Sequence, residues 1–269
     1  MTSNPDTGAK LRSLYAADGG VTSVFTERVA DYVASRPGYP HALFEALRAN
    51  DAIAPGATVA DVGSGTGLLT RDLLRNGYRV VAVEPNAEMR RASDLLLGGM
   101  DGYRSVEGCA ESIPLAAASV DLITAAQAFH WFEIERARAE FLRVLTGQGQ
   151  VALIWNDRAL EDPVQNALDE IFAAFGGAKR AALVVHEDRS KVPWFFGSTQ
   201  PRQFSWPNAH LLDERGLASL VFSRSYIPGR STAEGSEIAN RVRAVFERFA
   251  VNGQVEVRYR TIATLGRPA

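Results

Sequence analysis

The sequence contains little cysteine and little histidine. Cys109 is the only cysteine among 269 residues, so the chain can form neither an intramolecular disulfide nor a thiolate metal cluster. The four histidines do not have the spacing of a metal site; they are His41, His130, His186 and His210. We therefore expect a reducing compartment and no bound metal.

Long apolar runs and an excess of one charge are absent as well. The first eight residues lack the basic and apolar regions of a signal peptide, and no stretch approaches the ~20 apolar residues that span a bilayer. Lys and Arg total 29 against 31 Asp and Glu, so no net field attracts nucleic acid or an anionic membrane. We expect a cytoplasmic monomer or homodimer that binds neither of them.

The hydrophobic content is 46% over 269 residues, which is enough for one large domain with insertions. Strand patterns alternate with helix patterns, and this order favours a parallel sheet with helices on both faces. The expected strands are 58–62, 79–84, 103–107, 119–125, 149–155 and 254–264, and the expected helices are 133–145, 163–175, 212–221 and 235–250.

Residues 176–210 are predicted to be irregular because Pro193, Pro201 and Pro207 interrupt a run rich in aromatic residues. A loop of this length in a compact domain either binds a ligand or acts as a lid, or else it covers an edge of the core. The pattern leaves both interpretations open.

The most informative segment is 58–67, a short apolar strand that ends in alternating glycines. Gly63, Gly65 and Gly67 let the backbone turn tightly and approach a ligand more closely than a Cβ would permit. Residues 68–74 follow as a helix. The turn thus lies between a strand and a helix N-terminus, which is the usual position for a nucleotide-like ligand.

Two cofactors compete for this loop. A dinucleotide motif has the spacing G-x-G-x-x-G, whereas Gly67 comes one residue too early for it. The preceding Asp61 suits a cationic, amino-acid-like ligand better than a pyrophosphate. Glu84 ends the second strand, 21 positions after Gly63, where it can accept hydrogen bonds from both hydroxyls of a ribose. An NAD-dependent oxidoreductase stays possible on fold grounds, because such enzymes also carry an acid there.

Together, the motif D-x-G-x-G-x-G over 61–67 and the strand-terminal Glu84 resemble the class I S-adenosylmethionine-dependent methyltransferases. Further segments are similar to one subgroup, the small-molecule methyltransferases related to trans-aconitate methyltransferase. The resemblance covers roughly residues 25–265, and these segments are 32–40, 83–89, 126–132, 154–158, 223–226 and 259–261.

This resemblance implies a Rossmann-like, seven-stranded, mostly parallel sheet with helices on both faces and an antiparallel final strand. It also implies an N-terminal lid and, in the C-terminal half, an insertion over the cleft. We expect a flexible N-terminus over 1–20 and a single domain over 21–269. Its parts are a lid at 21–40, a cofactor-binding core at 41–155, an acceptor-side cap at 156–235 and a last helix and strand at 236–269.

The resemblance also implies S-adenosylmethionine as cofactor, S-adenosylhomocysteine as product and no metal. The residues expected around the methionine part are Asp61, Gly63, Ser64, Gly65, Gly67 and Gln127, with Asp61 accepting from water or from the amino group. In the lid, Arg36 is expected to pair with the methionine carboxylate and Tyr32 to close over it. An ordinary tight turn and a surface arginine are the plainer interpretations.

The remaining cofactor contacts follow the second and third strands. Glu84 and Pro85 are expected at the ribose, while Met89 is expected to pack on the adenine. Ala110 would hold the adenine edge through its backbone amide, and Glu111 would accept from the adenine amino group unless it merely faces solvent. Asn86 is expected to cap the following helix, and Cys109 to be a packing residue without a basic partner.

The acceptor side is less defined. Phe129, Trp131 and Trp155 are candidates for the wall of the substrate pocket. His130 is the candidate general base, or else a residue that holds its loop through backbone hydrogen bonds. Residues 156–235 carry nine basic and ten acidic side chains, so charge does not identify the acceptor.

The predicted function is therefore methyl transfer to an O, N or C atom of a small molecule by in-line displacement. The alternative is a protein that binds the same cofactor without transferring its methyl group, and that binds or rearranges a small ligand.

Overall fold

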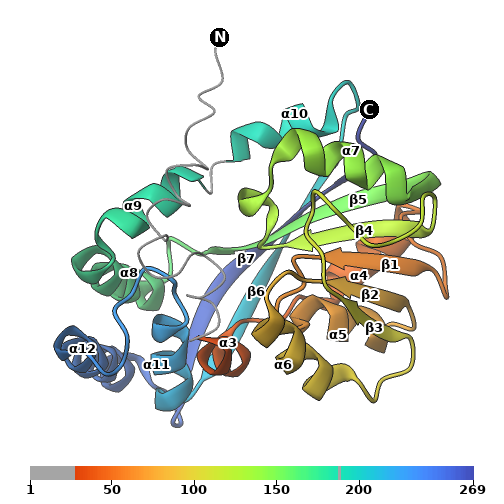
Figure 1. The fold of residues 1–269 in the computed structure, drawn as a ribbon. Helices are drawn as coiled ribbons and strands as arrows, with labels where there is room; N and C mark the ends of the chain where they lie inside the picture. The colour runs from red at the N-terminus through yellow and green to blue at the C-terminus, as the bar shows by residue number, and fades with distance from the viewer. Residues whose placement is uncertain (1–27, 187–188) are drawn as a thin grey trace. The chain divides into compact units, whose positions relative to one another are not determined.

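The computed structural model describes residues 28–186 and 189–269, and its chain divides into two compact units (Figure 1). The larger unit comprises residues 38–157, 189–208 and 260–269. The described part of the smaller unit comprises residues 28–37, 158–186 and 209–259. The predicted flexible N-terminus and the first part of the predicted lid lie outside the described residues.

Seven strands form one sheet in the order β3-β2-β1-β4-β5-β7-β6, mostly parallel with one antiparallel pair. This confirms the predicted Rossmann-like fold class. The strands are β1 (Thr58–Val62), β2 (Arg79–Val83), β3 (Tyr103–Val106), β4 (Val120–Ala126), β5 (Leu145–Arg158), β6 (Arg202–Leu212) and β7 (Val255–Gly266).

Helices of the larger unit cover both faces of its strands. Neighbouring strand residues point to opposite faces, so Val59 packs with α4 (His41–Ala49), α5 (Leu68–Arg75) and the end of α6 (Ala87–Leu97). Ala60 packs in a second cluster with α7 (Ile134–Val144) and α10 (Val192–Phe196). Figure 1 shows these two groups of helices on either side of the strands.

The smaller unit is built mainly of helices: α3 (Val29–Ser35), α8 (Pro163–Phe175), α9 (Gly177–His186), α11 (Glu214–Phe222) and α12 (Ala233–Phe249). Its core joins residues of α8, α11, α12 and the first part of β7. Helix α8 begins where the sequence predicted, because Pro163 occupies its first turn and the Asp162 side chain caps it by accepting from the Val164 amide at 3.2 Å.

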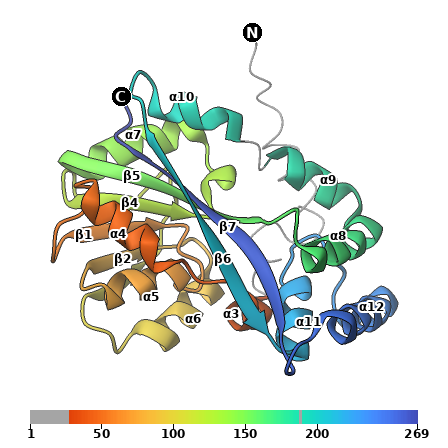
Figure 2. The ribbon, with the colours of Figure 1, turned by 180° about the vertical axis from the view of Figure 1, so that it is seen from behind.

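The prediction that 176–210 is irregular is wrong. The segment contains α9, a short 3-10 helix (Arg189–Lys191), α10 and most of β6 (Figure 2). Strand β6 is last in the sheet order, and an edge strand tolerates Pro207 because the missing N–H costs no internal ladder bond. Phe204 and Trp206 stack on one face of β6, with ring centroids 5.8 Å apart, and pack against the core.

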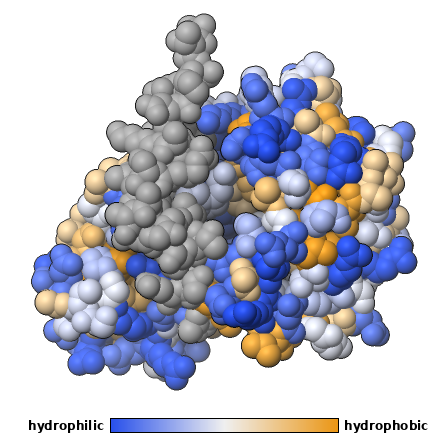
Figure 3. Space-filling view, viewed as in Figure 1, coloured by the Kyte–Doolittle hydropathy of each residue, from blue (hydrophilic) through white to orange (hydrophobic). Residues whose placement is uncertain are grey.

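Most of the aromatic side chains of this segment pack in or against the hydrophobic core. Phe195 and Phe196 are fully buried, whereas Trp194 is 46% exposed. The face of the molecule drawn in Figure 3 is largely hydrophilic, with smaller hydrophobic patches between. Among the described residues, none of the helices combines the length and the apolar character needed to cross a bilayer.

Candidate functional site

The loop between β1 and α5 contains three glycines in the left-handed region, with φ of +70° at Gly63, +57° at Gly65 and +82° at Gly67. A Cβ on Gly63 would lie 2.5 Å from the Cβ of Ala128, and one on Gly67 would lie 2.5 Å from atoms of Ser93 and Leu97. A Cβ on Gly65 would meet no atom within 4 Å. Packing thus explains the first and third glycines, while the second faces open space.

The loop also contains a buried hydroxyl. The Oγ of Ser64 has no hydrogen-bond partner within the described part of the chain. Buried polar groups are normally satisfied, so an unpaired hydroxyl beside the open position of Gly65 is a place where a ligand can add a hydrogen bond.

Asp61 lies near the end of β1 and is only 2% exposed. Its Oδ2 accepts from the Thr70 hydroxyl at 2.6 Å, and its Oδ1 accepts from the Thr124 hydroxyl at 2.8 Å. Burial raises the pKa of Asp61 to about 6, although both hydroxyls oppose that shift. The carboxylate is therefore largely ionised at neutral pH, and each oxygen keeps a second lone pair for a cationic group.

Glu84 follows β2 and links two loops. Its Oε2 accepts from the Gly65 amide and its Oε1 from the Asn86 amide, each at 2.9 Å. Burial raises the pKa of Glu84, while these two amides lower it. The charge of Asp61 raises the Glu84 pKa as well, so the two predicted acids lie close together. Each oxygen of Glu84 retains a lone pair that could accept from a ribose hydroxyl.

The Asn86 side chain begins α6 by accepting from the amides of Glu88 and Met89 at 2.9 and 3.0 Å. The predicted capping role is thereby confirmed. Met89 is 4% exposed, and Pro85 is exposed.

The segment after β3 is held by a carboxylate. Glu111 Oε1 accepts from the Glu133 amide at 2.7 Å, which ties this segment to the residue that precedes α7. Ala110 is 2% exposed. Burial raises the pKa of Cys109, and the Glu111 carboxylate raises it further, so the thiol is not activated as a nucleophile.

Gln127 directly follows β4 and is one of four non-glycine residues with positive φ among the described residues, at +56°. Its backbone N–H donates to the Ile154 carbonyl at 2.9 Å, and its side-chain Nε2 donates to the Asn156 backbone carbonyl at 3.1 Å. Non-glycine residues held in the left-handed region are strained, and they are concentrated at ligand sites.

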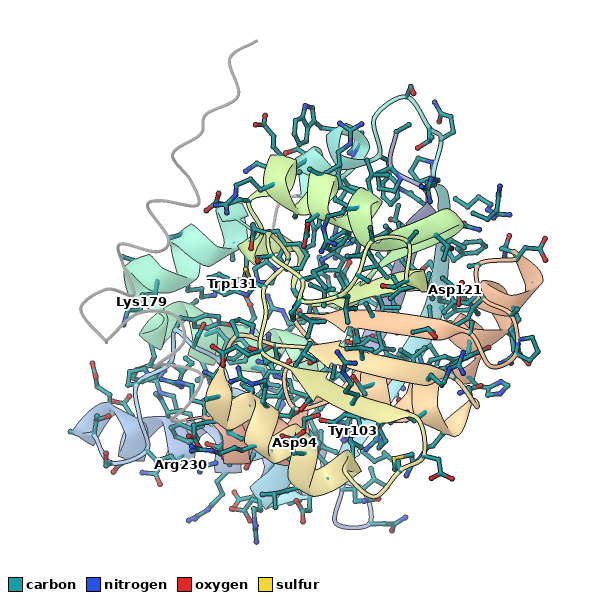
Figure 4. All side chains as sticks on the ribbon, turned by 45° about the vertical axis from the view of Figure 1, so that its right-hand side comes forward. Asp94, Tyr103, Asp121, Trp131, Lys179 and Arg230 are labelled. Atoms are coloured by element: carbon teal, nitrogen blue, oxygen red, sulfur yellow. The ribbon has the colours of Figure 1, made fainter. Side chains whose placement is uncertain are left out.

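The aromatic residues proposed for the acceptor wall differ in exposure. Phe129 and Trp155 are 4% and 5% exposed, and their rings meet edge to face with centroids 6.2 Å apart inside the core. His130 and Trp131 follow in a 3-10 helix (Phe129–Trp131) and are partly exposed, with ring centroids 4.9 Å apart. Figure 4 labels Trp131. The role of these four residues toward an acceptor stays a prediction.

All predicted cofactor and acceptor residues lie in the larger unit except Tyr32 and Arg36, which belong to the smaller one. There the Arg36 guanidinium lies 4.7 Å from the centre of the Tyr32 ring. Their contact with a cofactor stays a prediction.

Three supporting residues were missed from the sequence. Thr70 and Thr124 hold Asp61, as described above. Asn156 Oδ1 accepts from the Thr261 hydroxyl at 2.5 Å and from the Asn208 side chain at 3.2 Å, and its Nδ2 donates to the Gly38 carbonyl at 3.2 Å. The partners of Thr124 and Asn156 are distant in the chain, so no local motif indicates their roles, and Thr70 is nine positions from Asp61 without a motif that marks it. Within the described residues no three acidic, histidine or cysteine side chains form a metal-binding group.

A glycine-rich turn after the first strand of a doubly wound sheet, with an acid at the tip of the second, is typical of proteins that bind an adenosine-containing cofactor. The family model of a methyltransferase domain matches residues 60–153. An uncharacterized methyltransferase of Mycobacterium tuberculosis is 36% identical over 221 residues, which cover 81% of this chain and 84% of that protein. An uncharacterized methyltransferase of Schizosaccharomyces pombe is 37% identical over 204 residues, or 76% and 79% of the two chains. The chain therefore belongs to the methyltransferase family.

Solved structures agree on the fold. A protein from Anaeromyxobacter dehalogenans, which carries the name of a type II methyltransferase, superposes with a TM-score of 0.58 over 86% of this chain and 97% of its own, at 24% identity. The YcgJ protein of Bacillus subtilis gives a TM-score of 0.52 over 84% and 98%, at 20% identity. At these identities the likeness concerns the fold alone.

Proposed function

We propose that this methyltransferase transfers the methyl group of S-adenosylmethionine to a small molecule, and that it belongs to the subgroup related to trans-aconitate methyltransferase. The choice of cofactor rests on the hydrogen bond from the Gly65 backbone N–H to the Glu84 carboxylate. It places an open glycine position and a buried carboxylate side by side, which suits a ribose and an amino-acid moiety better than a pyrophosphate.

The residues of the loop fit this cofactor. The Asp61 carboxylate, largely ionised at neutral pH, can accept from the ammonium group. The unpaired Ser64 hydroxyl and the open position of Gly65 leave room and a hydrogen-bonding group for the methionine part. The spare lone pairs of Glu84 can accept from both ribose hydroxyls, while Met89, Ala110 and Glu111 would flank the adenine.

When bound, S-adenosylmethionine supplies an electrophilic methyl group on a positively charged sulfur, and this sulfur is the leaving group when a nucleophile attacks in line. The chain's own work is to hold donor and acceptor in that line and to exclude water. Where the accepting atom carries a proton, the His130 imidazole is the proposed base. The Gln127 side chain, fixed by its bond to the Asn156 carbonyl, would position the methionine part.

The acceptor is proposed to be a small molecule rather than a carrier protein or a nucleic acid. A malonyl-[acyl-carrier protein] O-methyltransferase of Methylococcus capsulatus is 39% identical over 109 residues, but these make up only 36% of this chain and 37% of that protein. This match is too short to assign the substrate of that enzyme to this chain.

Calorimetry tests the cofactor. The wild-type protein should bind S-adenosylmethionine or S-adenosylhomocysteine, and Asp61→Asn and Glu84→Gln should each weaken that binding by about tenfold or more, because each removes a charged hydrogen-bond acceptor. The matched control is Glu88→Gln, whose side chain is exposed and paired with Arg91, and it should leave the affinity unchanged. Binding of NAD in place of S-adenosylmethionine would refute the proposal.

Turnover is tested separately. Release of S-adenosylhomocysteine with at least one acceptor from a broad panel supports methyl transfer. Tight cofactor binding without release across the whole panel would support a cofactor-binding protein that does not transfer methyl groups.

A further inference from the structure

An arginine of α6 contacts the turn that contains the acid proposed for the ribose. Arg90 Nη1 donates to the backbone carbonyls of Glu84 and Pro85 at 2.7 and 2.9 Å, and its Nη2 pairs with Glu107 at 2.9 Å. The Arg90 side chain is only 16% exposed, whereas that of Glu107 is 77% exposed. The better shielded contacts of the guanidinium are therefore those with the turn that follows β2.

The helix itself does not account for a cation at this position. Arg90 lies in the first turn of α6, where its backbone N–H donates to the Asn86 carbonyl at 3.0 Å. The helix dipole favours anions at a helix N-terminus and disfavours cations. Helical side chains lean toward the N-terminus, and this direction brings the guanidinium back to residues 84 and 85. The contacts with the turn thus explain this arginine better than the helix does.

Arg90 brings a positive charge to Glu84 without occupying its carboxylate. Within the described residues, the guanidinium bonds to the Glu84 backbone carbonyl and makes no hydrogen bond or ion pair with the carboxylate. The carboxylate oxygens accept from the backbone N–H groups of Gly65 and Asn86 instead. A direct ion pair would use the lone pairs that two ribose hydroxyls require. Each oxygen therefore keeps one lone pair for a ligand.

The groups around Glu84 act on its charge in opposite directions. Burial raises the pKa of Glu84, and the charge of Asp61 on β1 raises it as well. The amides of Asn86 and Gly65 and the charge of Arg90 lower the Glu84 pKa. Only the ionised carboxyl can accept from two hydroxyls at once with both of its oxygens, because the protonated form presents a donor on one of them.

We infer that Arg90 is a positioning residue for the ribose of the cofactor: it fixes the turn that carries Glu84 and places a positive charge near the carboxylate that receives the ribose hydroxyls. The inference rests on the proposed function. Arg90 acts through Glu84, so its loss should reduce the selectivity for the hydroxyls more than the affinity for the rest of the cofactor.

Calorimetry compares the wild type with Arg90→Met, Arg90→Lys and Arg91→Met. Arg91 is the matched control, because it is the next residue of the same helix and its exposed side chain pairs with Glu88. The ligands are S-adenosylhomocysteine and its 2′-deoxy and 3′-deoxy analogues, each of which lacks one ribose hydroxyl. Melting curves show whether each variant is folded. If Arg90→Met is not, Arg90→Gln takes its place, since its neutral amide can still donate to one carbonyl.

The ratio of the affinities for S-adenosylhomocysteine and a deoxy analogue measures the contribution of one hydroxyl. In the wild type this preference should be about tenfold, as for a hydrogen bond to a charged group. In Arg90→Met it should fall to about threefold or less, because the acceptor is less fixed and less ionised. Arg90→Lys restores the charge and should recover most of the preference, and Arg91→Met should keep all of it.

The pH dependence of this preference is a readout that a merely structural role would not change. Loss of the Arg90 charge raises the Glu84 pKa, so on acidification the preference should disappear at a higher pH in Arg90→Met than in the wild type. Arg90→Lys should follow the wild type. Burial raises the Asp61 pKa to about 6, so Asp61 titrates as well, but its proposed contact with the ammonium group is common to all three ligands and cancels in the ratio.

A folded Arg90→Met protein that keeps the full preference for the hydroxyls overturns the inference. So does a loss of affinity that is equal for the three ligands, or a loss of preference in Arg91→Met as large as that in Arg90→Met. The proposed function fails in a different way: the wild type then does not bind S-adenosylhomocysteine, or binds it no better than the deoxy analogues, which would separate Glu84 from the ribose.

Discussion

Each of the two units buries charged groups, and they differ in how these are satisfied. In the larger unit, Asp61 receives two threonine hydroxyls and Glu84 receives two backbone amides. In the smaller unit, Arg36 faces a second arginine and makes one long hydrogen bond. A charge that the chain satisfies itself is held in a fixed position, whereas a charge that it does not satisfy indicates a ligand of opposite sign.

The largest effect is expected for Gly63→Ala in the larger unit. The new Cβ would lie 2.5 Å from Ala128 in a left-handed backbone, so the free energy of unfolding should fall by about 3 kcal/mol. Gly77→Ala is the matched control, because its φ is +83° but no atom lies within 4 Å, and about 1 kcal/mol is expected. Urea unfolding measures both. Equal losses in the two variants would contradict the packing role of Gly63.

Asp61→Asn should have the next largest effect on the free energy of unfolding, and this effect should depend on pH. The folded pKa of Asp61 is about 6 and its ordinary value is 3.8, so the folded state binds the proton more tightly than the unfolded state. The contribution of Asp61 to stability is therefore fully present below pH 4 and is lost as the pH rises through 6. At pH 8 the asparagine variant should be more stable than the wild type by about 2 kcal/mol, and this difference should shrink toward zero near pH 4. A difference independent of pH, measured by urea unfolding, would show that the Asp61 pKa is not raised.

Gly65→Ala separates binding from stability. Its Cβ meets no protein atom, so only the left-handed backbone costs stability, by about 1 kcal/mol. The affinity for S-adenosylhomocysteine should nevertheless fall by about tenfold or more, because the Cβ occupies the space proposed for the cofactor. Unchanged affinity in calorimetry would place the cofactor elsewhere.

The smallest effect is expected for Arg243→Met, whose ion pair with Glu214 spans 3.0 Å between exposed side chains. Exposed pairs contribute little, so the free energy of unfolding should change by less than about 0.5 kcal/mol. A larger loss of unfolding free energy in urea would show that exposed ion pairs of the smaller unit contribute substantially to its stability. The contrast between these pairs and the buried Arg36 would then be weaker.

The glycine-rich turn between β1 and α5 could be predicted from the sequence because its information is local. Glycines at 63, 65 and 67 follow one strand directly, and Glu84 ends the next strand. Helix α8 was predicted with both its ends for the same reason, since Pro163 and Gly176 mark its limits within one short stretch. Such signals require only neighbouring residues.

The other features of the fold and of the candidate site could not be predicted, because they depend on residues that are far apart in the chain. Thr124 bonds to Asp61 across 63 positions, and nothing in strand β4 distinguishes this threonine from any other. Arg36, Arg224 and Tyr259 lie in three segments that resemble the subgroup, but nothing in the sequence indicates that these three side chains come together. Strand β6 was missed because Pro207 and its polar neighbours are typical of a loop, and only the edge position in the sheet makes them acceptable.

The path of the chain through the two units has a consequence for biosynthesis. The chain passes from one unit to the other five times, at 37/38, 157/158, 188/189, 208/209 and 259/260. Neither unit is a continuous piece, so neither can be complete on the ribosome before its most C-terminal segment has emerged. The core of the smaller unit requires Val255 and Val257, while Ala263 and Leu265 complete a cluster of the larger unit. A chain that ends at Gln254 lacks all four residues, so it should expose apolar surface in both units at once and become a target for chaperones.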